Sequence, residues 1–195
     1  RRGGASMPRD SAMSKTALAN QHGPSAPTPL PSLAGMTRDE LEAAAEALGE
    51  PRYRGRQVAD WVWRRRAATF EAMSDLPKHF RAALAERYAL RTGAVAAERT
   101  AADGTRKWLV RWPDGEAAET VRIPGKGKEG TPRVTACLSS QVGCAVRCDF
   151  CASGLSGVRR DLSAAEIAEQ YLLQGTDAAP PDHVVFMGMG EPFFN

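Results

Sequence analysis

The chain has 195 residues, of which a quarter are charged, and a formal net charge of +3. This length fits one ordinary domain, or a small domain followed by part of a larger one. The sequence predicts neither a transmembrane helix nor a signal peptide, so we expect a cytoplasmic protein without membrane attachment.

Residues 1–35 are rich in Ser, Pro, Gly and Ala. Such a segment buries too little apolar surface to offset the entropy that ordering costs. We therefore predict a disordered tail over residues 1–35.

Helical patterns follow the tail. Thr37 and Glu40 have the spacing of a capping box, and apolar residues then recur at helical intervals. A second helix is expected over residues 55–68, and a third begins at Pro77, a residue type that suits a first helical turn. Together these elements predict a small helical accessory domain over residues 36–92.

Residues 93–133 change to a strand pattern and predict a β-hairpin segment with a loop. A turn signal at 103–104 precedes the strand-like run 107–112, and a second turn leads into 119–124. The run 125–130 is rich in Gly and Lys, so we expect a flexible loop there.

Residues 134–195 predict a strand–helix–strand unit. A short strand over 134–139 leads into the cysteines, and Ser163 with Glu166 opens a helix through a capping box. The apolar run 183–187 suits a strand that is covered on both faces. This order predicts a right-handed crossover and a parallel sheet.

The four cysteines of the chain all lie between Cys137 and Cys151. A disulfide framework would spread them along the chain, so clustering favours metal ligation in a reducing compartment. Cys144, Cys148 and Cys151 have C-x3-C-x2-C spacing, and three thiolates can hold a [4Fe–4S] cluster that keeps one iron open. The alternative is a structural zinc site with Cys137 as the fourth ligand, although zinc sites usually show paired C-x2-C units or histidines.

The sequence around this triplet resembles that of the radical S-adenosylmethionine (SAM) superfamily. Within it, residues 137–144 (CLSSQVGC) and 187–192 (MGMGEP) are similar to the dual-specificity 23S rRNA and tRNA adenine-C2 methyltransferase family. Residues 105–108 and 119–124 match further motifs of that family, and the resemblance covers residues 36–195. It implies an α/β fold, in which a small helical domain and a β-hairpin segment precede the first βαβ unit of a truncated radical-SAM (β/α) barrel.

The resemblance also implies roles for single residues. It assigns the cluster ligands to Cys144, Cys148 and Cys151. Gly190 and Glu191 would contact SAM, with Glu191 accepting a hydrogen bond from its ammonium group. Cys137 would take the proton from the adenine ring and then release the enzyme–RNA crosslink by forming a disulfide. Glu119 is the other candidate for the proton acceptor.

The resemblance further implies partners and a missing part. The substrates would be 23S rRNA and tRNA, and a flavodoxin or ferredoxin would donate electrons. In the family a cysteine near the C-terminus carries the methyl group, but no cysteine follows Cys151. We therefore expect an N-terminal fragment that is inactive alone, with a loop over 125–133 longer than is usual in the family. The alternatives are an adenine-C8 methyltransferase and a non-catalytic RNA-binding module with a structural metal.

Arg64, Arg65 and Arg66 follow two tryptophans, and such interleaving of cations and aromatics suits phosphate contact and base stacking. We predict RNA contact there. The alternative is a solvated helix face. Lys126 and Lys128 are secondary candidates.

Overall fold

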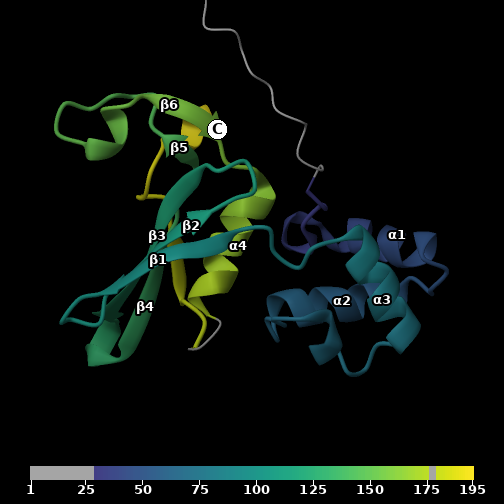
Figure 1. The fold of residues 1–195 in the computed structure, drawn as a ribbon. Helices are drawn as coiled ribbons and strands as arrows, with labels where there is room; N and C mark the ends of the chain where they lie inside the picture. Colours follow the sequence, from purple (N-terminus) through teal and green to yellow (C-terminus); the bar gives the residue numbers. More distant parts are fainter. Residues whose placement is uncertain (1–28, 176–178) are drawn as a thin grey trace, which may run out of the picture.

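A computed structural model describes residues 29–175 and 179–195. It shows a helical part and a β-sheet, with helix α4 (Ala164–Gln174) between them (Figure 1). The mixed α/β class predicted from the sequence is therefore confirmed. In the described part of the chain no helix is long and apolar enough to cross a membrane.

Three helices form the first part of the structure. They are α1 (Arg38–Ala47), α2 (Tyr53–Trp63) and α3 (Lys78–Arg87). The capping box that opens α1 is present: the Glu40 N–H donates to the Thr37 hydroxyl, and the Thr37 N–H donates to the Glu40 carboxylate. The second helix is displaced from the predicted 55–68. It ends early because Arg66 has a φ of 50°, which a right-handed helix does not accept.

The helical core begins before the predicted boundary at residue 36. Leu33 is fully buried within a short 3-10 helix, η1 (Leu33–Gly35), and its N–H donates to the carbonyl of Ala89 over 2.8 Å. The rest of the predicted tail, residues 1–28, lies outside the described residues. Leu33 joins the apolar side chains of the three helices in one core, which Leu172 of α4 also enters.

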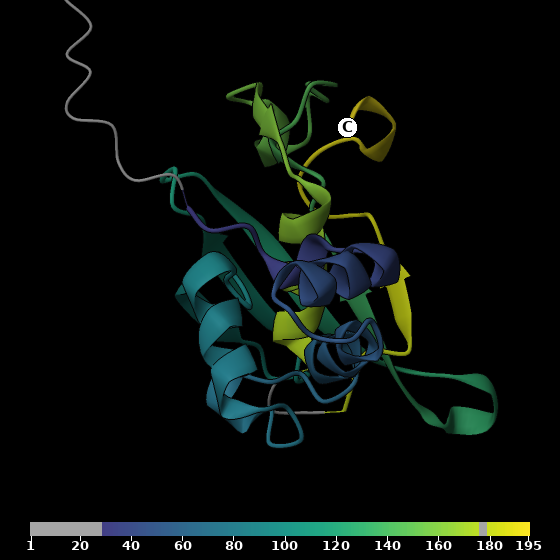
Figure 2. The same cartoon turned by 90° about the vertical axis from the view of Figure 1, so that its right-hand side faces the viewer.

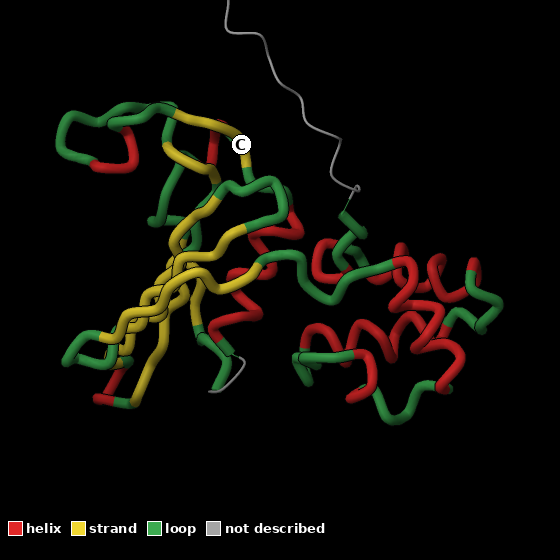
Figure 3. Tube along the Cα trace, in the orientation of Figure 1, coloured by secondary structure: helices red, strands yellow, loops and turns green. Residues whose placement is uncertain are grey.

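A mixed sheet forms the second part (Figure 3). Its strands, in spatial order, are β1 (Ala94–Thr100), β2 (Arg106–Arg111), β3 (Ala117–Lys126), β4 (Pro132–Cys137) and β7 (His183–Val185). Only the β4–β7 pair is parallel, and the other neighbours are antiparallel. Strands β5 (Gln141–Gly143) and β6 (Val158–Asp161) form a separate two-stranded ribbon. The remaining 3-10 helices are η2 (Phe70–Ala72), η3 (Lys128–Gly130), η4 (Ala152–Gly154) and η5 (Pro192–Phe194).

Helix α4 connects the parallel strands β4 and β7, so the predicted βαβ unit is present. Its Ser163–Glu166 capping box is also as predicted. The expectation that residues 183–187 form a strand covered on both faces is wrong. Among residues 29–175 and 179–195, strand β7 lies at the edge of the sheet and pairs with β4 alone, which leaves Val184 and Phe186 each 46% exposed.

Two further details of the sheet differ from expectation. Strand β3 runs to Lys126, and η3 closes the hairpin, so most of the predicted loop over 125–130 has regular structure. Strand β1 was not foreseen. Its sequence is rich in alanine, and all seven of its residues are exposed, so it lacks the alternation that marks a half-buried strand.

The two faces of the sheet have different environments. Trp108, Ala118 and Thr120 face α4, and the Gln174 side chain donates to the Thr120 hydroxyl over 2.6 Å. Successive side chains alternate across a strand, so the neighbouring residues point to the opposite face, which we call the open face. By this alternation and the strand register, the open face carries Lys107, Leu109, Glu119, Val121, Cys137 and Val185.

A buried carboxylate joins the helical part to the sheet. Glu169 of α4 is 3% exposed and accepts hydrogen bonds from the backbone N–H groups of Thr92 and Gly93, each over 2.8 Å. The indole N–H of Trp112 donates to the same carboxylate over 3.2 Å. Residues 92–93 are the link between α3 and β1, so one side chain fixes the link, the sheet and α4 together.

We predict that Glu169→Gln destabilises the chain by about 1–3 kcal/mol, because an amide presents an NH2 group to donors that need an acceptor. The measurement is the free energy of unfolding in urea, followed by circular dichroism. The matched control is Glu86→Gln on the exposed face of α3, where a change within about 0.5 kcal/mol is expected. Equal effects at the two positions would contradict the role assigned to Glu169.

Candidate functional site

The three spaced cysteines lie in one loop, residues 144–157, between strands β5 and β6. The neck of the loop is narrow: the Cys144 N–H donates to the Gly157 carbonyl over 3.3 Å. Gly143 and Gly157 both have positive φ values, 79° and 69°, which glycine adopts without strain. Cys144 is buried, whereas Cys148 and Cys151 are partly exposed. The pairing of β5 with β6 thus presents the cysteine loop as a unit.

The donor set fits an iron–sulfur cluster in its chemistry, since three thiols with this spacing come from a single loop. Hydrogen bonds from the backbone and side chain of Ser153 lower the pKa of Cys151, which favours the thiolate that a metal requires. Within residues 29–175 and 179–195, however, no three Cys, His, Asp or Glu side chains converge as a ligand group. All four cysteines are free thiols.

The turn that carries Gly190 and Glu191 packs against the segment just before the cysteine loop. The Ser140 N–H donates to the Met189 carbonyl over 2.8 Å, and the Met189 N–H donates to the Ser139 hydroxyl over 2.8 Å. Two segments about fifty residues apart are therefore held side by side. This brings the predicted cofactor-binding turn next to the predicted cluster loop.

Gln141 is the polar centre of this packing. Its side chain is almost completely buried; the amide oxygen accepts from the Glu191 N–H over 3.1 Å, and the amide nitrogen donates to the Asp161 carboxylate over 2.7 Å. Gln141 therefore links strand β5, strand β6 and the Gly190–Glu191 turn.

Gly190 allows this close approach. It has a φ of 97°, and a Cβ at this position would lie 2.6 Å from the backbone nitrogen of Gln141 and 2.7 Å from the Ser140 hydroxyl oxygen. The carboxylate of Glu191 accepts from the Phe193 N–H over 3.1 Å and so caps η5. Its contact with an ammonium group stays a prediction.

Cys137 and Glu119 point to the same face of the sheet, the open face. Cys137 pairs with Val121 across strands β4 and β3, and Glu119 lies two residues from Val121 on β3. Burial raises the pKa of the Cys137 thiol, an effect that the Met187 backbone N–H partly offsets. Glu119 forms an ion pair with Lys107 over 2.9 Å, with both side chains 44% exposed. The two candidate proton acceptors thus differ: a neutral buried thiol and a paired, solvated carboxylate.

The three candidate RNA-binding arginines have different environments. Arg64 and Arg65 both pair with Asp60, over 3.0 and 2.7 Å, and Arg65 also lies over the Trp61 ring. Arg66 points inward to α4, where its guanidinium lies 5.5 Å from the centre of the Tyr171 ring. Only Arg64 keeps a largely exposed side chain, at 84%.

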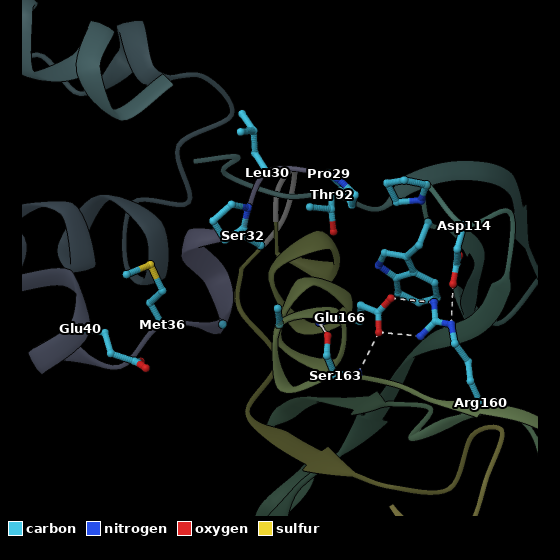
Figure 4. A pocket seen from close by; sticks show the side chains of 15 residues that line it. Pro29, Leu30, Ser32, Met36, Glu40, Thr92, Asp114, Arg160, Ser163 and Glu166 are labelled. Carbon is cyan, nitrogen blue, oxygen red and sulfur yellow. Dashed lines mark hydrogen bonds and ion pairs between the residues drawn. The ribbon is translucent and has the colours of Figure 1, made fainter. Parts of the chain in front are cut away.

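A cavity of about 590 Å³ lies between the helical part and the sheet (Figure 4). Arg160 borders it and pairs with Asp114 over 2.6 Å and with Glu166 over 2.7 Å. The cavity is lined by residues of the 29–36 segment, the turn after β2 and the start of α4, and none of the four cysteines is among them. We interpret it as a junction between the two parts and not as the reaction site.

Sequence reasoning overlooked Gln141 and Ser139 as site residues. Both lie inside the CLSSQVGC motif, so the motif itself carried the signal. A buried polar side chain needs hydrogen-bond partners, and here those partners are Glu191, Asp161 and Met189.

Known proteins resemble the chain in both of its parts. Residues 32–90 match the ribosomal RNA large subunit methyltransferase N-terminal domain. The dual-specificity RNA methyltransferase RlmN of Nitratidesulfovibrio vulgaris is 45% identical over 168 residues, which are 82% of this chain and 46% of that protein. The RlmN of Alkalilimnicola ehrlichii is 48% identical over 169 residues, which are 84% of this chain and 45% of the relative.

A solved structure is also similar to the chain. It is the crystal structure of a radical SAM methyltransferase from Sphaerobacter thermophilus, with a TM-score of 0.77 and 41% sequence identity. The match covers 85% of this chain and 48% of that one. The chain therefore spans about half the length of the relatives that it matches.

We predict that Gly190→Ala destabilises the chain by about 1–3 kcal/mol, because the added Cβ collides with residues 140–141 and the positive φ becomes strained. Unfolding in urea gives the magnitude, and hydrogen exchange should quicken at residues 139–141. The control is Gly115→Ala, which has a similar φ of 86° but nothing within 4 Å of its Cβ. If the free energy of unfolding falls no more for Gly190→Ala than for Gly115→Ala, the close approach at Gly190 does not contribute to stability.

We also predict that the Cys137 thiol of the reduced, metal-free chain stays protonated to a higher pH than an ordinary cysteine, because burial raises its pKa. The rate of its alkylation by iodoacetamide, followed by mass spectrometry of the peptide, should therefore rise at higher pH than in the urea-unfolded chain. The same pH midpoint in both states would contradict this prediction.

Proposed function

We propose that this chain, a homologue of the dual-specificity RNA methyltransferases, forms the cluster-binding and substrate-facing part of a radical SAM enzyme. The whole protein would methylate adenine C2 in 23S rRNA and tRNA. The observation that carries the proposal is that the Gly190–Glu191 turn is hydrogen-bonded to residues 139–141, the segment that leads through β5 into the C-x3-C-x2-C loop. Motif and geometry then point to one site.

In this proposal Cys144, Cys148 and Cys151 would hold a [4Fe–4S] cluster. When bound, such a cluster would supply an open iron for SAM and the electron that cleaves its sulfonium bond. An electron donor such as flavodoxin or ferredoxin would be required. A cytoplasmic location, where thiols stay reduced, goes with this chemistry.

The residues of the chain would bind and orient SAM. Gly188 and Gly190 have no side chains, so the turn packs closely against residues 138–141, which fixes the backbone that would face SAM. Glu191 would accept from the SAM ammonium group, a charge-assisted contact that both orients and holds a cation. Gln141 fixes the backbone of Glu191 and so supports this contact.

The open face would receive the adenine. Cys137 would take the ring proton as a thiolate and later form a disulfide with the methyl-carrying cysteine expected in the rest of the protein; the electron pair of the broken carbon–sulfur bond would leave with the RNA. Because burial raises its pKa, Cys137 is a protonated thiol at rest and must lose its proton before it acts. Glu119 is the alternative acceptor. It is already paired with Lys107 over 2.9 Å, and we therefore give it the role of orienting the substrate.

We predict that anaerobic treatment with iron and sulfide gives a brown chain with up to about four irons. Alanine at Cys144, Cys148 or Cys151 should remove most of this iron, since each thiolate is a ligand. The matched control is Cys137→Ala, which should keep the iron. Iron content and the visible absorption spectrum provide the measurement.

The competing function is a non-catalytic RNA-binding module with a structural zinc. Tetrahedral zinc without iron uptake, lost equally in all four cysteine variants, would favour that module and contradict the enzyme proposal. The outcomes differ because the zinc site requires Cys137 and the cluster does not.

A further inference from the structure

The hairpin that joins β3 to β4 extends beyond the rest of the sheet and projects from the molecule (Figure 2). We call residues 124–133 the basic arm, because they contain three cations, Lys126, Lys128 and Arg133, and one anion, Glu129. The arm has a defined shape: the Gly127 N–H donates to the Thr131 carbonyl over 2.8 Å, and η3 closes the end.

The cations of the basic arm lack ionic partners. Lys126, Lys128 and Arg133 are all exposed, and within the described ranges no ion pair includes any of them. Arg64 and Arg65 of the helical part, by contrast, are held by Asp60. An unpaired cation can neutralise a phosphate without first breaking an internal ion pair, so the basic arm is better prepared for a polyanion than the arginines near α2.

The arm is continuous with the strands that carry the candidate reactive residues. Arg133 and Cys137 are on β4 with the same parity, so both side chains point to the open face. Four residues of strand separate them by about 13 Å, roughly the rise of four nucleotides along a strand. Gly125 stands opposite Arg133 and, having no side chain, leaves that guanidinium uncovered.

We propose that the basic arm is a phosphate-binding site that grips the RNA backbone a few nucleotides from the base placed at Cys137. This inference rests on the proposed function for the class of partner, an RNA. Arg133 would meet the nearer phosphates on the open face. Lys128 lies at the tip of the arm and Lys126 points to the opposite face by the strand alternation, so both would meet phosphates where the RNA backbone passes the end of the arm. Such contacts would fix the register of the RNA without reading its sequence.

The test uses the whole chain and a fluorescein-labelled tRNA transcript, with binding followed by anisotropy at several KCl concentrations. Lys126→Gln with Arg133→Gln should weaken binding roughly fivefold or more and reduce the salt slope by about 1.5–2, since two phosphate contacts are lost. The charge-matched control is Lys78→Gln with Arg87→Gln on α3, which should leave the slope unchanged. Lys126→Arg with Arg133→Lys keeps the charges and should bind as the unmodified chain does.

If the Lys126→Gln, Arg133→Gln variant binds RNA with the same salt slope as the α3 control variant, the proposal is overturned. Binding of the arm to an acidic protein would not rescue it. An unmodified chain that binds no RNA at low salt would also overturn the proposal. Iron uptake, measured in parallel, separates this proposal from the enzyme proposal. A chain that takes up no iron but shows arm-dependent RNA binding would refute the enzyme and keep the arm.

Discussion

The side-chain amide of Gln141 holds together the parts on which any chemistry of this chain depends. It reaches the Glu191 backbone with its oxygen and the Asp161 carboxylate with its nitrogen, and it is buried while doing so. A buried amide that lost either partner would leave a polar atom unsatisfied, so both bonds must form for the segment to pack. The cysteine loop and the glycine-rich turn consequently have one relative position. A ligand that contacts both loops would find them already placed.

The difference between the two faces of the sheet explains where the reactive groups lie. Helix α4 covers the central part of one face, where Trp108 and Ala118 are buried. The alternation of a strand then sends Glu119 and Cys137 to the other face, together with Lys107. The same alternation along β4 sends Arg133 in that direction too. Reaction site and basic arm are therefore consequences of one register between β3 and β4.

Local signals in the sequence identified much of the fold. Both capping boxes are present because Thr37 and Ser163 satisfy backbone N–H groups three residues away, an interaction that needs no tertiary context. Elements that depend on pairing with another strand were missed. Strand β1 exists because β2 pairs with it, and the hairpin extends to Lys126 because β4 supplies a partner for each added residue.

The residues of the candidate site also fall into two groups: those that a local pattern identifies and those that it does not. Spacing alone singled out the cysteine triplet, since three thiols within one short loop have few other uses. The Gln141 contacts cross 20 residues of sequence to Asp161 and 50 to Glu191, and no local pattern encodes them. The face on which Cys137 lies depends on strand register, which a reader of the sequence cannot fix to one residue.

Arg66 illustrates how a charge-based reading of a sequence can assign a residue to the wrong partner. Its guanidinium stacks near Tyr171 and donates toward the Gly175 carbonyl, and its left-handed backbone ends the preceding helix region. Replacing Arg64, Arg65 and Arg66 together would therefore loosen the contact between the helical part and α4. A drop in RNA affinity in such a block variant would report a shifted domain and would be misattributed to lost phosphate contacts. Scanning this stretch one position at a time keeps the two causes apart.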